Sequence, residues 1–78
     1  MKLIILNLPR DFSEDDLVRL FEIHGEIKTS NLVIDENTGV SKGFGFVEMA
    51  LETEAEIAIS ELHGTRIKRH KIRVKPAD

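Results

Sequence analysis

The sequence predicts an α+β domain in which two helices cover one face of a four-stranded antiparallel sheet. Three observations carry this prediction: short apolar stretches with strand-like alternation, two amphipathic stretches with helical spacing, and the order in which they follow one another. With 78 residues the chain has room for one hydrophobic core. We therefore expect a single domain over residues 1–78.

The first half of the chain predicts a strand, a helix and a second strand. Residues 2–7 are rich in aliphatic side chains, and the proline of Asn7-Leu8-Pro9 ends the strand. Ser13 is a typical helix N-cap, and the three acids after it complement the helix dipole. Apolar residues follow at helical spacing up to His24-Gly25, where the glycine predicts the stop. Residues 28–34 alternate again and predict the second strand.

The second half of the chain predicts the same three elements again. Residues 42–49 alternate as a strand, and Thr53-Glu54-Ala55-Glu56 predicts a capping box for a helix that ends at Gly64. Residues 71–75 predict a last strand with apolar side chains inward and basic ones outward. The resulting βαββαβ order is that of a ferredoxin-like sandwich. Right-handed crossovers place both helices on one face of its sheet.

Strand parity divides the side chains between a core face and an open face. Phe44 and Phe46 alternate with Val47 and Met49, which claim the core side, so we expect the two rings on the open face. The expected core is Leu3, Ile5, Leu32, Val47, Met49, Ile72 and Val74 against Leu17, Phe21, Ala58, Ile59 and Leu62. The expected open face carries Ile4, Leu6, Val33, Phe44, Phe46, Arg73 and Lys75.

Charge is distributed unevenly along the chain. The net charge is −3, yet six of the eleven basic residues lie in 66–75, and ten of the fourteen acids lie in 11–26 and 52–61. Such a chain can present a basic face despite a negative total charge.

The chain has no cysteine, which excludes disulfides and thiolate metal sites, and it has no apolar run of membrane-spanning length. We find no metal-ligand spacing, no phosphate-binding glycine loop opening a helix and no paired nucleophile and base, so we expect no cofactor and no catalysis.

Two motifs resemble the signatures of the RNA-recognition-motif family. Lys42-Gly43-Phe44-Gly45-Phe46-Val47-Glu48-Met49 is similar to the family's octamer in seven of eight positions, with a methionine at the last aromatic position. Leu3-Ile4-Ile5-Leu6-Asn7-Leu8 is similar to its hexamer, with Ile4 at the aromatic position. The resemblance spans nearly the whole chain and includes small single-motif proteins of the bacterial type. A chain of this length is compatible with a complete short protein or with a domain of a longer one.

This resemblance implies a non-catalytic module that binds single-stranded RNA, with single-stranded DNA as a second ligand to test. Phe44 and Phe46 would stack bases, whereas Ile4 offers no π-face. Since stacking contributes roughly 1–3 kcal/mol per base, two rings predict binding in the range of roughly micromolar to millimolar. The RNA-binding residues that we expect are Ile4, Leu6, Asn7, Lys42, Phe44, Phe46, Glu48, Lys71, Arg73 and Lys75.

Other interpretations of the same residues stay open at this point. The apolar open face is also typical of a protein–protein interface or of self-association. The basic residues of 66–75 are also what an exposed edge strand needs to avoid aggregation, and an ion pair of Glu48 with a basic residue of a neighbouring strand is the simpler alternative to base contact. We expect a cytoplasmic location, or a nuclear one if the source is eukaryotic.

Overall fold

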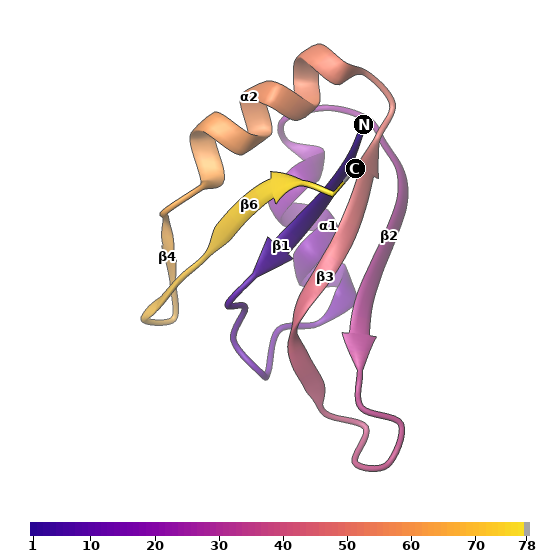
Figure 1. Ribbon diagram of the computed structural model, residues 1–78, viewed down its shortest axis with the longest axis vertical. Helices are drawn as coiled ribbons and strands as arrows, with labels where there is room; N and C mark the ends of the chain where they lie inside the picture. Colours follow the sequence, from indigo (N-terminus) through magenta and orange to yellow (C-terminus); the bar gives the residue numbers. More distant parts are fainter. Residues whose placement is uncertain (78) are drawn as a thin grey trace.

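The computed structural model, which describes residues 1–77, consists of one four-stranded sheet, two helices and a small hairpin. In chain order the elements are β1 (Lys2–Leu6), α1 (Glu14–Glu22), β2 (Ile27–Ile34), β3 (Ser41–Met49), α2 (Glu52–Leu62), β4 (Arg66–Ile67), β5 (His70–Lys71) and β6 (Arg73–Pro76). The strand order of the sheet is β2-β3-β1-β6, with antiparallel neighbours. Figure 1 shows α1 behind the sheet and the front face uncovered. The predicted α+β, ferredoxin-like fold is confirmed.

One hydrophobic core lies between the sheet and the helices. Its buried residues are Leu3, Ile5, Leu8, Phe12, Leu17, Phe21, Leu32, Val47, Met49, Ala55, Ala58, Leu62, Ile72 and Val74. Every predicted core residue is among them except Ile59, which is half-buried and packs against the core edge. Leu8 and Phe12 were not predicted, because they belong to the connection after β1 rather than to a periodic element.

The glycine at position 45 lets α1 approach the centre of the sheet. A Cβ atom on Gly45 would lie 2.8 Å from the carbonyl oxygen of Asn31 and 3.1 Å from a methyl group of Leu17. The first of these atoms belongs to the backbone of β2 and cannot move aside without displacing that strand. Gly45 therefore keeps the inner side of β3 free for the contact with α1.

The start of α1 is fixed by the predicted Ser13 cap. The Ser13 hydroxyl accepts a hydrogen bond from the Asp16 N–H at 3.0 Å, and the Asp16 carboxylate accepts one from the Ser13 N–H at 3.0 Å. These reciprocal bonds form a capping box. The helix ends earlier than predicted, at Glu22, and His24 lies beyond it because the chain already turns toward β2.

The predicted capping box of the second helix is wrong. Helix α2 begins at Glu52, so Thr53 lies inside the first turn, and its N-cap is Leu51, which makes no side-chain capping bond. The carboxylate of Glu54 instead accepts from the N–H of Glu26 at 3.4 Å, outside the helix. The acids Glu52 and Glu54 still complement the dipole at this end.

The predicted last strand is divided in two at Ile72. The Ile72 carbonyl accepts from the N–H of Gly64, and its N–H donates to the carbonyl of Thr65. These bonds hold Ile72 against the segment after α2, so Lys71 falls in the β4–β5 hairpin and β6 begins at Arg73. Within residues 1–77, neither helix has the length and apolar character that crossing a membrane requires.

Candidate nucleic-acid interface

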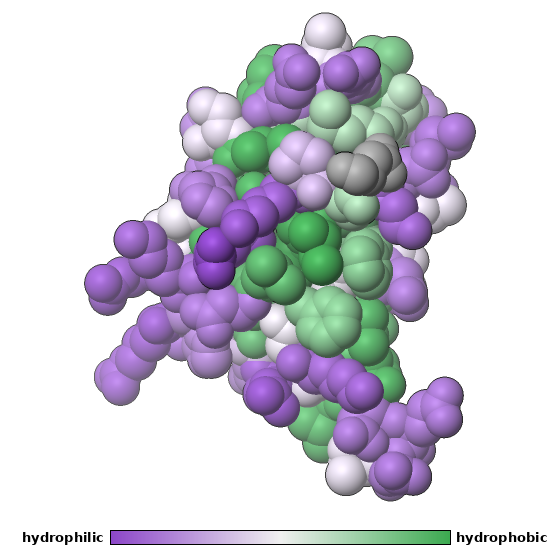
Figure 2. All heavy atoms as spheres, in the orientation of Figure 1, coloured by the Kyte–Doolittle hydropathy of each residue, from purple (hydrophilic) through white to green (hydrophobic). Residues whose placement is uncertain are grey.

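Two phenylalanine rings lie on the uncovered face of the sheet. Phe44 and Phe46 are half-buried, while their sequence neighbours Gly43, Gly45 and Val47 are buried on the core side. The ring centroids are 6.2 Å apart and the ring planes meet at 82°, an edge-to-face arrangement. Figure 2 shows an apolar area over the middle of this face, bordered by hydrophilic groups. Half-exposed aromatic rings beside polar groups can serve as stacking surfaces.

The register of the sheet places Phe46 in one row with side chains from the three other strands. Ile4 of β1 lies opposite Phe46, and Lys75 of β6 lies opposite Ile4 on its other side. Asn31 of β2 is the partner of Phe46 on the remaining side. This row across the open face therefore consists, in order, of the Asn31 amide, the Phe46 ring, the Ile4 side chain and the Lys75 ammonium.

Leu6 and Arg73 form a second pair on this face, where β1 ends and β6 begins. Leu6 and Val33 are half-buried, whereas Arg73 is exposed. The structure thus places all seven residues predicted for the open face on strand positions of the outward parity. This confirms their position, whereas their contact with a ligand stays a prediction.

Lys2 is a feature of the open face that sequence reasoning missed. Its ammonium lies 5.1 Å from the centroid of the Phe46 ring, within the range of a cation–π interaction. Lys2 is also the register partner of Glu48, the acid predicted to contact RNA. The parity of residues 2–7 contained the signal, because Lys2 shares the face of Ile4 and Leu6.

The predicted cations are not all on the same surface. Lys42 lies at the start of β3 and Lys75 on β6, both exposed on the open face. Lys71 is also exposed, but it pairs with Arg66 in the separate hairpin. The prediction that Lys71 continues the basic row of the last strand is therefore wrong, because the backbone changes partners at Ile72.

Asn7 connects this hairpin to the end of β1. Its φ angle is +63°, in the left-handed region that asparagine tolerates better than most residues. Its side-chain amide donates a hydrogen bond of 3.0 Å to the carbonyl oxygen of Lys71. One of its polar groups is therefore used to position the hairpin.

A second connection to the hairpin is the ion pair between Lys68 and Asp11, with 3.0 Å between the Lys68 nitrogen and the Asp11 oxygen. The hydrogen bond from Lys68 lowers the pKa of the Asp11 carboxyl below its ordinary value. Both side chains are largely exposed, so the pair stabilises the fold little. Its consequence is local, because the Lys68 ammonium offsets the charge of the Asp11 carboxylate.

A hollow of about 330 Å³ lies beside Phe44 at the end of the sheet where β1 stops and β3 starts. We call it the basic hollow. Its lining residues are Leu6, Asn7, Leu8, Arg10, Lys42, Gly43, Phe44 and His70. Sequence reasoning missed Arg10, from the connection after β1, and His70, from the short strand β5, because they lie far apart in the chain and carry no periodic signal.

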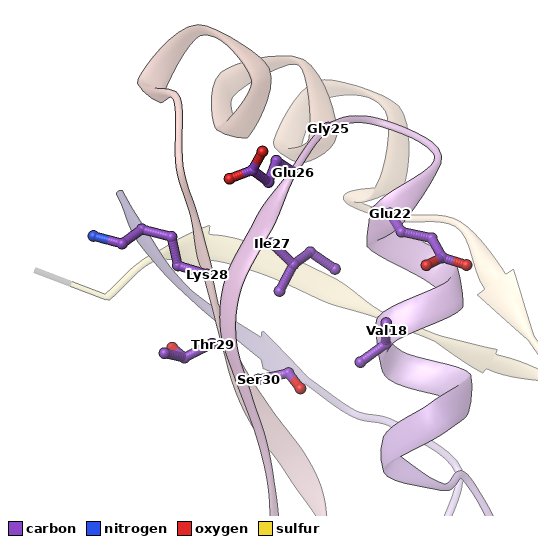
Figure 3. A pocket seen from close by; sticks show the side chains of 8 residues that line it. All are labelled: Val18, Glu22, Gly25, Glu26, Ile27, Lys28, Thr29 and Ser30. Atoms are coloured by element: carbon purple, nitrogen blue, oxygen red, sulfur yellow. The ribbon is translucent and has the colours of Figure 1, made fainter.

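A larger hollow of about 560 Å³ lies away from the rings, between α1 and β2. Val18 and Ile27 point into it, whereas Lys28 and Thr29 point to the other side of the strand (Figure 3). The acids Glu22 and Glu26 also line it, and their charge opposes the binding of a phosphate chain. No cluster of three or more potential metal ligands occurs among residues 1–77.

Comparison with known proteins identifies the class to which this fold and face belong. The family model described as RNA recognition motif matches residues 3–73. The chain is 39% identical over 77 residues to RNA-binding protein CP31B, chloroplastic, of Arabidopsis thaliana, covering 99% of this chain and 27% of that protein. It is 42% identical over 74 residues to paraspeckle component 1 of Bos taurus, covering 95% and 13%.

Two solved structures at similar identity have the same fold. The crystal structure of RNA binding protein PG1 superimposes with a TM-score of 0.94 at 38% identity, covering 99% of this chain and 93% of that one. The Sxl-lethal protein/RNA complex gives a TM-score of 0.94 at 32% identity, covering 99% and 46%.

The chain belongs to the RNA-recognition-motif family. It spans roughly a quarter to a third of the length of the first curated relatives that it matches. Several of these relatives are chloroplast proteins, so a cytoplasmic location stays a prediction for this chain.

Proposed function

We propose that this chain binds single-stranded RNA on the open face of its sheet, without catalysing a reaction. The observation that carries the proposal is the pair of half-exposed rings, Phe44 and Phe46, on a face that no helix covers. In an RNA-recognition motif, aromatic side chains on the central strands stack unpaired bases. Here both rings lie on β3, one of the two central strands.

Each ring has a different environment for a base. Phe44 adjoins the basic hollow, so a base on this ring has cations beside its phosphate. One face of Phe46 is approached by the Lys2 ammonium, and a base that takes this face displaces Lys2. The released ammonium is then free for a phosphate, while Ile4 supports the base from β1 with apolar contact only.

The remaining predicted residues surround these two sites. Lys42, Arg73 and Lys75 are exposed cations at the margins of the face and contact phosphates or base edges. Lys71 extends this basic margin into the hairpin, and Leu6 gives apolar support. Glu48 accepts from a base amino group, and the Asn7 carbonyl oxygen, which its bond to Lys71 leaves free, is a further acceptor.

Removal of the rings tests the proposal. We expect Phe44→Ala/Phe46→Ala to lose about 2–6 kcal/mol of binding free energy, which weakens binding by about 30-fold or more. Fluorescence anisotropy with labelled RNA octamers of each of the four bases measures the affinity. A matched control is Ile23→Ala/Ile57→Ala, which removes two exposed apolar side chains from the helical side. Undiminished affinity of the ring variant, with its circular dichroism spectrum intact, refutes the site.

Salt dependence tests the phosphate contacts separately. For a single strand, log K falls with log salt concentration with a slope of about −0.7 for each phosphate bound. An affinity that does not change with salt contradicts the role of the exposed cations. DNA octamers of the same sequences show whether the 2′-hydroxyl is read.

The same variants test the alternative of a protein interface. If the apolar open face serves self-association, the mass in solution rises with protein concentration and the ring variant stays monomeric. Analytical ultracentrifugation over a concentration series measures this. If the chain self-associates and the RNA octamers do not dissociate the oligomer, the result is evidence against the RNA site.

A further inference from the structure

We infer that Arg10 makes the basic hollow a phosphate-binding subsite, which holds the RNA phosphate next to the base on Phe44. This inference rests on the proposed function and adds to it a residue outside both sequence signatures. The hollow is open, has a volume of about 330 Å³ and shares Phe44 with the stacking surface. A nucleotide on that ring therefore has the hollow within reach of its own sugar–phosphate backbone.

The position of Arg10 depends on a glycine of the octamer motif. Gly43 has a φ angle of +87°, and a Cβ atom at this position would lie 3.2 Å from Nε of Arg10 and 3.3 Å from the carbonyl oxygen of Leu8. The N–H of Leu8 also donates to the carbonyl oxygen of Gly43 at 2.8 Å. The connection after β1 is thus held against the start of β3, and the guanidinium stem lies along the Gly43 backbone.

Three segments bring positive or hydrogen-bonding groups to this one place. Arg10 comes from the connection after β1, Lys42 from the start of β3 and His70 from the hairpin. The hairpin is held there by the bond from Asn7 to Lys71. Figure 1 shows the hairpin on the side of the sheet next to the end of β1.

The charge of the hollow matches a phosphate group. Neither an aspartate nor a glutamate lines it. Asp11, adjacent to Arg10 in sequence, is already paired with Lys68. A guanidinium offers two parallel N–H donors that suit phosphate oxygens, and a lysine adds a compact charge.

The hairpin turn supports the same assignment. Lys68 and Arg69 occupy its two central positions with φ angles of +48° and +75°. Turns of this kind favour asparagine and glycine, because other side chains are strained at positive φ. Because Lys68 is paired with Asp11, Arg69 is the turn residue that adds net positive charge next to His70, and it does so despite an unfavourable backbone conformation.

The test compares Arg10→Gln with Arg19→Gln, using the homopolymer RNA octamer that binds the wild-type chain. Arg19 is exposed on α1, on the other side of the sheet, so both variants lose one positive charge. We expect the salt slope of Arg10→Gln to be smaller by about 0.7, the value for one lost phosphate contact, and that of Arg19→Gln to be unchanged. Arg10→Lys keeps the charge and should restore the slope, which separates charge from packing against Gly43.

Octamers with a single neutral methylphosphonate linkage then locate the contact. One linkage should weaken binding to the wild-type chain but not to Arg10→Gln, because the double change removes one shared interaction. Competition by inorganic phosphate, beyond that of chloride at equal ionic strength, would show that the hollow also takes the free ion. The absence of any such coupled linkage, or equal slopes for both Gln variants, overturns the inference and leaves the proposed function standing. If the wild-type chain binds none of the four octamers, the proposed function fails, and the inference fails with it.

Discussion

The two faces of strand β3 differ in burial, and in the proposed function one face serves stability and the other serves binding. Gly45, Val47 and Met49 are buried on the core side, while Phe44, Phe46 and Glu48 between and beside them are half-buried on the open face. Successive side chains of a strand point to opposite faces, so the two functions alternate along the chain without sharing a residue. Substitutions on one face should therefore change stability, and substitutions on the other should change affinity.

The largest difference in stability between the two faces is expected for the alanine variants of two phenylalanines. Phe21 is fully buried under the sheet, and its replacement by alanine should lower the free energy of unfolding by about 3–5 kcal/mol. That is a large part of the roughly 4–12 kcal/mol expected for a domain of this size. Phe46→Ala on the open face should lower it by only about 0.2–1 kcal/mol, as for a cross-strand contact.

Urea unfolding followed by circular dichroism measures both values. The comparison also requires that the folded fraction of Phe21→Ala binds RNA as the wild-type chain does. If Phe46→Ala destabilises the fold as much as Phe21→Ala, the open face belongs to the core and the separation of faces is wrong.

Sequence reasoning predicted what depends on local periodicity. The alternation of residues 42–49 placed Phe44 and Phe46 on the open face, and Ser13 identified the start of α1, because both signals lie within a few residues. The start of α2 was missed although Thr53 and Glu56 have the right spacing. The helix instead starts two residues earlier than this capping box requires, with Leu51 as its N-cap, and the tertiary contact of Glu54 with the Glu26 N–H accompanies that earlier start.

Features that depend on contacts between distant segments could not be predicted. The division of the last strand at Ile72 depends on bonds to Gly64 and Thr65. Likewise, the basic hollow joins Arg10 and His70, which are sixty residues apart in the chain. Neither residue lies in a periodic element, so no pattern in the sequence indicated that they meet.

A second prediction places the same substitution on the two faces of β1. Ile4 lies opposite Phe46 on the open face, where the family's hexamer has an aromatic residue, and Ile4→Phe supplies a third ring. We expect RNA affinity to rise by about 5- to 150-fold, the equivalent of roughly 1–3 kcal/mol of stacking. Ile5→Phe, one residue further and fully buried, should instead destabilise the fold by about 1–3 kcal/mol through overpacking.

Anisotropy and urea unfolding on both variants check this pair of outcomes. Ile4→Leu is the control without a ring, and its affinity should stay near that of the wild-type chain. An Ile4→Phe variant with unchanged affinity would show that β1 does not take part in stacking.

The smallest effect is expected on the helical side, at the cap of α1. Ser13→Ala removes the acceptor of the Asp16 N–H and should lower the free energy of unfolding by about 0.5–2 kcal/mol, with RNA affinity unchanged.

The bond from the Ser13 N–H lowers the pKa of the Asp16 carboxyl below its ordinary value of 3.8. A carboxyl whose pKa is lower in the folded state stabilises the fold above the unfolded value, and this contribution is lost as the pH falls through the folded pKa. Asp16→Asn should therefore reduce the loss of stability below about pH 4, measured by urea unfolding from pH 7 to pH 2. Asp15→Asn, in the same turn but outside the capping box, should keep the acid dependence of the wild-type chain. If both variants lose it equally, the dependence comes from the dipole of α1 and not from the cap.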